Sequence, residues 1–138
     1  MRGSGQPRRV ILDVDTGSDD AVAIMLALRH PAIELLGVTT VHGNAAVDVV
    51  VDNTLRVIEL AGARLPVLRG AERPLERPDF PIPRSHLPER AVHARPLPLP
   101  PARSRPAAGH AVDFLIDTVL AAPGTVSLVP VLHGRGLR

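Results

Sequence analysis

Residues 10–20 read VILDVDTGSDD, and this stretch decides the fold. A short apolar run ends in Asp13, and such a run is typical of a strand that is buried on both faces of a parallel sheet. Polar turn residues follow, and Ser18 or Asp19 can cap a helix that begins there. A strand, an acidic turn and a helix in this order predict the opening unit of an α/β fold.

The chain repeats this alternation outward from the opening unit. We expect the first helix to stop at Pro31 and the second at Gly62, because proline and glycine end helices. The later elements are predicted as a strand at 35–41, a helix at 48–61, a strand at 66–68, a helix at 110–121 and a strand at 126–131. In the last helix, the side chains expected to face inward are those of Val112, Leu115, Ile116 and Val119. The pattern predicts an α/β fold with an open, mainly parallel, Rossmann-like sheet and flanking helices.

The composition narrows the function classes. The chain has 138 residues, of which 45% are apolar, but only Phe80 and Phe114 are aromatic, so a core must be built from Val, Leu, Ile and Ala. The absence of cysteine excludes disulfides, thiolate zinc sites and cysteine nucleophiles. No apolar run approaches the roughly 20 residues that span a bilayer, so we expect no membrane partner.

The basic residues do not form a nucleic-acid-binding pattern. All sixteen are Arg, and they are scattered without aromatic neighbours that could stack on bases. We therefore expect no nucleic-acid partner, although the net charge is +2. Residues 1–9 are polar and basic and lack the apolar stretch of a secretory signal, so we expect a cytoplasmic protein.

Prolines gather in one part of the chain, and proline disfavours both helix and sheet. We expect a single, partial domain over residues 1–138 with an irregular, Pro- and Arg-rich insert or loop at 79–106.

Residues 13–20 place four carboxylates within eight positions. Two unit charges about 4 Å apart repel by roughly 4 kcal/mol at an effective dielectric of about 20, whereas a helix N-terminus returns only about 0.3–1 kcal/mol per contact. A divalent cation would offset the rest, and oxygen ligands favour Ca²⁺ or Mg²⁺. The structural alternative is that Asp13 makes turn hydrogen bonds while Asp19 and Asp20 cap the helix.

Residues 13–21 read DVDTGSDDA, and residues 39–44 read TTVHGN. In order and interval they resemble the D-x-D-P-G-x-D-D-A and T-T-V-x-G-N signatures of the nucleoside hydrolases, the inosine-uridine-preferring nucleoside N-ribohydrolases. The resemblance continues over about residues 9–78 and 106–131 and corresponds to the N-terminal part of that family. It implies an incomplete nucleoside hydrolase fold.

The resemblance also implies a reaction: hydrolysis of the N-glycosidic bond of a ribonucleoside to ribose and a free base, with Ca²⁺ as cofactor. Asp15 and Asp20 would be calcium ligands, together with the main-chain carbonyl of Val131. Asp15 would also be the general base for the calcium-bound water, and Asp19 and Asn44 would hydrogen-bond the ribose hydroxyls and the water. An anionic pocket suits this reaction because the departing base leaves an oxocarbenium-like sugar. The implied partners are the ribonucleoside and, as in many relatives, further copies of the chain in a homo-oligomer.

The sequence departs from the family's pattern at three places. Thr16 stands where proline is usual, residues 82–101 lack a glycine-rich H-G-x-x-G-L-G-like loop, and a G-P-L-T-N-like turn does not follow Pro130. The family's second half, with a further calcium-ligand Asp and a His that assists the leaving base, is missing from the sequence. We therefore expect the product of a truncated or frameshifted coding region, with weak or no hydrolase activity.

Two other interpretations compete with hydrolysis. Haloacid-dehalogenase-like phosphatases carry D-x-D-G-T after a buried strand, but residues 13–17 reverse the last two letters, and the second signature stays unexplained. The other alternative is a catalytically inactive relic that binds a divalent ion or ribose, or an oligomerising fragment. A half-domain exposes a sheet edge and apolar helix faces, which favours association.

Overall fold

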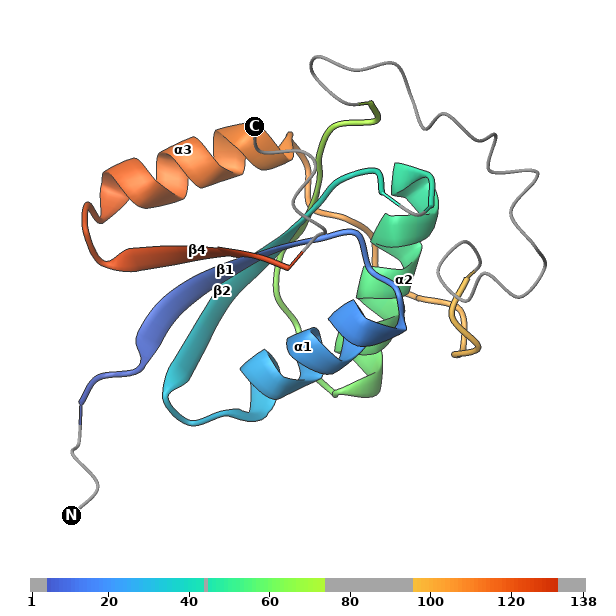
Figure 1. The fold of residues 1–138 in the computed structure, drawn as a ribbon, viewed down its shortest axis with the longest axis horizontal. Helices are drawn as coiled ribbons and strands as arrows, with labels where there is room; N and C mark the ends of the chain where they lie inside the picture. Colours follow the sequence, from blue (N-terminus) through green and yellow to red (C-terminus); the bar gives the residue numbers. More distant parts are fainter. Residues whose placement is uncertain (1–4, 44, 74–95, 132–138) are drawn as a thin grey trace.

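Figure 1 shows the protein as a computed structural model, which describes residues 5–43, 45–73 and 96–131. The elements in chain order are β1 (Arg8–Val14), α1 (Ser18–Arg29), β2 (Ile33–Thr40), α2 (Val47–Leu60), β3 (Val67–Arg69), α3 (Ala111–Ala121) and β4 (Val126–Pro130). Each predicted strand and helix is present, with ends that differ from the expected ones by at most two residues. The α/β class predicted from the alternation is confirmed.

The strands of the described residues form a four-stranded sheet in the order β3-β2-β1-β4, and every pair is parallel. β1 lies between β2 and β4, with Leu12 opposite Val38 on one side and Val129 on the other. β3 and β4 are the edges of this sheet. The predicted open, parallel, Rossmann-like sheet is therefore present.

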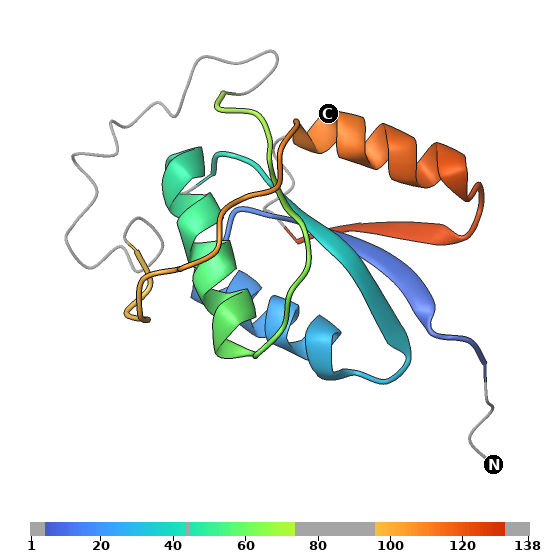
Figure 2. The ribbon, with the colours of Figure 1, turned by 180° about the vertical axis from the view of Figure 1, so that it is seen from behind.

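The helices divide between the two faces of the sheet. α1 and α2 cover one face and pack against each other, whereas α3 lies on the opposite face (Figures 1 and 2). Right-handed crossovers account for this division, because the chain moves from β1 outward to β3 and then returns across the sheet to β4. The direction of travel reverses between β1 and β4, so the carboxyl ends of these two strands form the topological switch point where α/β sheets bind their ligands.

The core lies between the sheet and the pair α1 and α2. Its buried side chains are aliphatic, as the composition requires, and include Val10, Leu12, Val14, Ile24, Val38, Val51, Leu55, Val57, Ile58 and Val67. Gly62 follows α2 with φ 71°, a left-handed conformation that suits glycine and ends the helix as predicted.

The prediction of which α3 side chains face inward is largely wrong. Val112 and Ile116 are 51% and 50% exposed, and Val119 is also exposed, whereas Leu115 is half-buried. α3 instead meets the sheet through Ala111 and Phe114, and the Phe114 ring lies over Gly37 of β2, where a Cβ would press on it. The helix carries apolar residues around more than one face, and only the face with Ala111 has the sheet beneath it.

The predicted insert at 79–106 lies largely outside the described residues. Its described part, 96–106, contains no helix or strand and runs along α2. None of the helices in the described ranges has the length and apolar character that crossing a bilayer requires.

Candidate active site

The acid loop, residues 13–20, leaves the carboxyl end of β1 and enters α1 at the switch point. The end of β2 is fastened beside it, because the Val41 amide donates to the Val14 carbonyl at 3.0 Å. Gly43 follows and lies directly against the Asp15 side chain, so that any Cβ at this position would collide with the Asp15 carboxylate. The two signature loops therefore meet at one edge of the sheet, as far as residue 43.

Asp15 and Asp20 come together across the turn. The Asp15 amide donates to Asp20 Oδ2 at 3.2 Å, and Asp20 is only 2% exposed. The pKa of Asp20 is raised from 3.8 to about 7, first by burial and then by the hydrogen bond with the Asp15 carboxyl and the charges of Asp15 and Asp19. The loop therefore holds a buried acid beside a second acid, an arrangement that disfavours two negative charges at once.

The helix cap differs from the one predicted from the sequence. Gly17 is the N-cap residue of α1 and makes no side-chain cap hydrogen bond, while Ser18 is already helical. The helix begins early because the Ala21 amide donates to the Gly17 carbonyl at 3.1 Å. The Asp20 carboxylate turns back to the Asp15 amide, so it is not used as a cap.

Asp13 is fixed by the neighbouring strand. Thr39 Oγ1 donates to Asp13 Oδ1 at 2.7 Å. Burial raises the pKa of Asp13 and the nearby Asp15 adds to the rise, although the Thr39 hydrogen bond acts in the opposite direction. This hydrogen bond of the Asp13 side chain is therefore with the neighbouring strand β2, whereas the structural alternative expected hydrogen bonds within the turn.

Val131 follows β4 and continues its pairing with β1. Its amide donates to the Asp13 carbonyl at 2.9 Å. The Asp20 carboxylate accepts a hydrogen bond from the Asp15 amide, two residues further along the chain. The Val131 amide and the Asp20 carboxylate therefore both bind backbone groups of the acid loop.

Two predicted site residues remain, of which one is exposed and the other lies outside the described residues. Asp19 is in the first turn of α1 and is exposed, although its charge acts on Asp20. Asn44 lies outside the described residues.

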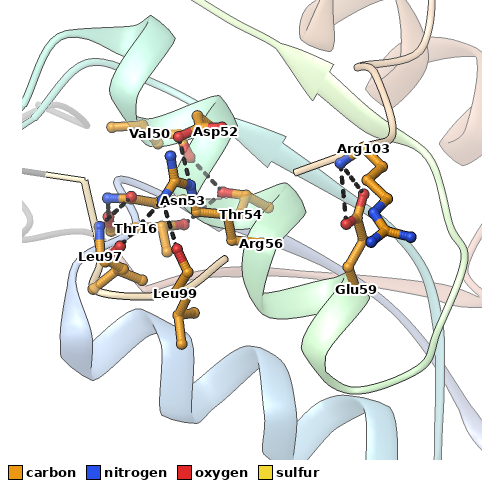
Figure 3. Close-up of polar contacts among 10 residues, drawn as sticks. All are labelled: Thr16, Val50, Asp52, Asn53, Thr54, Arg56, Glu59, Leu97, Leu99 and Arg103. Carbon is orange, nitrogen blue, oxygen red and sulfur yellow. Dashed lines mark hydrogen bonds and ion pairs between the residues drawn. The ribbon is translucent and has the colours of Figure 1, made fainter. Parts of the chain in front are cut away.

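Sequence reasoning missed a polar network that holds the acid loop from α2 (Figure 3). Thr16 Oγ1 and Thr54 Oγ1 are 2.7 Å apart, and the Asn53 side-chain amide donates to the Thr16 carbonyl at 3.0 Å. All three side chains are fully buried. The available signal was the pair Asn53 and Thr54, which interrupts an otherwise apolar helix face with groups that need hydrogen-bond partners when buried.

The carboxylates that the structure brings together at the switch point, those of Asp15 and Asp20, offer only oxygen donors. Within the described ranges, no group of three or more His, Cys, Asp or Glu side chains is arranged to hold a metal ion. Ca²⁺ takes about six to eight oxygen ligands and accepts backbone carbonyls, hydroxyls and water among them. The residues fit such a cation because a positive charge would relieve the buried Asp20 held against Asp15.

Comparison with known proteins identifies the family. The sequence model described as inosine-uridine preferring nucleoside hydrolase matches residues 10–131. The chain belongs to this family. The resemblance to the nucleoside hydrolases is thus confirmed. The family match favours this assignment over the haloacid-dehalogenase-like phosphatase.

Curated relatives of this nucleoside hydrolase chain are considerably longer. An uncharacterized protein of Schizosaccharomyces pombe is 43% identical over 122 residues, which cover 87% of this chain and 38% of the relative. The pyrimidine-specific ribonucleoside hydrolase RihB of Escherichia coli (strain SE11) is 40% identical over 126 residues, which cover 91% of this chain and 39% of the relative. The chain therefore spans about two fifths of the length of the curated relatives it matches.

Solved structures agree with the fold. A purine-preferring ribonucleoside hydrolase from Gardnerella vaginalis superposes with a TM-score of 0.77 at 29% identity, covering 89% of this chain and 40% of the other. A plant nucleoside hydrolase, the PpNRh1 enzyme, gives a TM-score of 0.74 at 31% identity, covering 91% and 39%. The fold described above is therefore part of the nucleoside hydrolase fold.

Proposed function

We propose that the acid loop of this chain binds Ca²⁺ and the ribose of a ribonucleoside, and that the site serves hydrolysis of the N-glycosidic bond. The observation that carries the proposal is the pairing of Asp15 with the buried Asp20 at the switch point of a nucleoside hydrolase sheet. Both kinds of nucleoside named for the matched proteins, purine and pyrimidine, share the ribose, so the proposal concerns the sugar and not the base.

Asp15, Asp20 and the Val131 carbonyl would hold the cation. A bound Ca²⁺ would fix the sugar hydroxyls and lower the pKa of an attacking water. Asp15 is the residue suited to take the proton of that water, because its carboxylate is half-buried and lies at the edge where β1 and β2 end. The negative charge of the loop would also stabilise the cationic sugar that forms as the base leaves.

Asp19 and Asn44 are proposed to hydrogen-bond the ribose. Asp19 is exposed at the first turn of α1 and can therefore reach a ligand outside the sheet edge. Asn44 follows Gly43, which already lies against Asp15.

Calcium titration by isothermal calorimetry tests the metal part directly. We expect saturable binding to the chain, and a loss of at least about tenfold in affinity for Asp20→Asn, since each factor of ten corresponds to about 1.4 kcal/mol and a ligand carboxylate contributes at least that much. Asp117→Asn, on the exposed side of α3, is the matched control and should leave the affinity unchanged. A chain that folds but shows no calcium binding would contradict the proposal.

Release of free base from inosine and uridine tests the reaction. The chain spans two fifths of its relatives, and we expect base release that is weak compared with a full-length relative, and that disappears in Asp15→Asn. Calcium and ribose binding without any base release would instead favour the alternative function, an ion- and ribose-binding protein.

A further inference from the structure

One face of α2 binds the backbone of a segment that is distant in sequence, residues 96–105. Asn53, Arg56 and Glu59 are spaced three residues apart and therefore lie along one side of the helix. Arg56 Nη1 donates to the carbonyl oxygens of Leu97 at 3.3 Å and Leu99 at 2.8 Å. These contacts fasten the segment to α2 (Figure 3).

Glu59 holds the far end of the same segment. Its carboxylate accepts hydrogen bonds from the amides of Arg103, at 2.9 Å, and Ser104, at 2.6 Å. The Ser104 hydroxyl also donates to this carboxylate, and its hydrogen bond, together with those of the two amides, lowers the pKa of Glu59 and so favours its charged form. Glu59 makes no described contact with the acid loop, so this end of the segment is separate from the site.

Asn53 differs from the other two residues because it binds both the segment and the acid loop. Its Oδ1 accepts from the Leu97 amide at 2.7 Å, and its Nδ2 donates to the Thr16 carbonyl at 3.0 Å. The side chain is fully buried, as is that of Thr16, and Leu97 is also buried. One amide group therefore serves as acceptor for one part of the chain and as donor for another.

Thr16 lies in the middle of the acid loop. The Asp15 amide just before it donates to Asp20 Oδ2, and the Gly17 carbonyl just after it receives the first hydrogen bond of α1. A shift of the Thr16 peptide would move Asp15 relative to the start of α1, where Asp20 is carried. The hydrogen bond from Asn53 opposes that shift.

We propose that Asn53 is a positioning residue that keeps Asp15 and Asp20 in register only while segment 96–105 is docked on α2. Docking satisfies Asn53 Oδ1 and fixes the rotation of the amide, which aims Nδ2 at Thr16. Loss of the Leu97 hydrogen bond removes one of the restraints on that rotation and takes the Leu97 donor away from the buried Oδ1, so that Nδ2 is held less firmly toward Thr16. The inference rests on the proposed function in its calcium arm but predicts a property of the loop that can be measured without calcium.

Hydrogen exchange of the Asp15 and Leu97 amides, followed by NMR in the full chain, gives the test that does not depend on calcium. Asn53→Leu, which is close in size, removes both hydrogen bonds, and we expect faster exchange at both amides by about tenfold or more. Arg56→Met loosens the segment without touching the acid loop, and we expect faster exchange at Leu97 and, through Asn53, at Asp15. Glu59→Gln, at the far end of the segment, is the control and should leave Asp15 unchanged.

Calcium titration of the same variants forms the second arm. We expect the calcium affinity to fall about tenfold in Asn53→Leu, the effect of losing one buried hydrogen bond, and to fall by a smaller factor in Arg56→Met. Unchanged exchange at Asp15 in Arg56→Met, with faster exchange at Leu97, would overturn the positioning role, as would unchanged Asp15 exchange in Asn53→Leu. Exchange results as expected in a chain that binds no calcium would preserve the positioning of the loop and overturn the proposed function instead.

Discussion

The two faces of the sheet are made from the same kinds of residue and are covered to very different degrees. On the face of α1 and α2, Ile24 and Val57 are 0% and 1% exposed. On the face of α3, Ile116 is 50% exposed and Leu120 is 70% exposed, and Leu128 of the edge strand β4 is 48% exposed. Apolar content alone therefore does not determine burial. What matters is whether a second element packs against the first, as α2 packs against α1.

A matched pair of substitutions measures this difference between the faces. Ile24→Ala removes a fully buried side chain and should lower the free energy of unfolding by about 2–5 kcal/mol. Ile116→Ala makes the same chemical change on α3 and should alter it by less than about 1 kcal/mol, because half of that side chain is already in water. Urea unfolding followed by circular dichroism gives both values. Equal losses would show that the α3 face is covered in solution.

A second contrast is between Asp20, a buried acid of the acid loop, and Asp117, an exposed acid of α3. Asp20 has a pKa raised from 3.8 to about 7, so between these values the folded chain holds a proton that the unfolded chain has released. The free energy of unfolding should therefore fall as the pH rises through this window, by up to about 1.4 kcal/mol per pH unit, and should level off above about pH 7. The raised pKa of Asp13 acts in the same direction.

Urea unfolding without calcium, between about pH 5 and pH 8, tests this dependence. Asp20→Asn should flatten the profile, whereas Asp117→Asn, on the exposed side of α3, should leave it as in the wild type. An unchanged slope in Asp20→Asn would show that Asp20 does not hold the proton.

The smallest effect on stability is expected at the exposed apolar side chains, where the larger effect is on association. Leu120→Gln and Leu128→Thr keep the local helix and strand preferences and should change the free energy of unfolding by less than about 0.5 kcal/mol. They should shift the sedimentation of the chain toward the monomer, because exposed apolar patches and open strand edges promote association. Sedimentation velocity over a range of concentrations measures the shift, and identical profiles for wild type and variants would exclude this face as a contact between copies.

Most of the fold could be predicted from the sequence because its information is local. The run before Asp13, Pro31 after the first helix and Gly62 after the second each mark an element through its own backbone preferences. The orientation of α3 could not be predicted in this way. Val112 and Ile116 have the spacing of an inward face, but burial depends on what the rest of the chain places opposite them.

The candidate site, like the fold, could be predicted only in part. The closeness of Asp15 and Asp20 followed from their places after a buried strand, and the structure confirms it. The bridge made by Asn53 could not be predicted, because its partner Leu97 is 44 residues away. The sequence between Asn53 and Leu97 includes a proline-rich stretch, and its pattern does not predict which later residue contacts α2.

The position of β4 beside β1 also has a consequence for biosynthesis. Among the strands that the structure describes, β1 is the first to be made and β4 the last, yet Arg9 pairs with Val126. A ribosome adds about 5–20 residues per second, so β1, β2 and β3 are available to assemble several seconds before β4 emerges. During that interval Val131, whose amide binds the Asp13 carbonyl, is absent from the edge of β1. The contacts of the acid loop with the chain beyond β4 thus form after the layer that supports the loop.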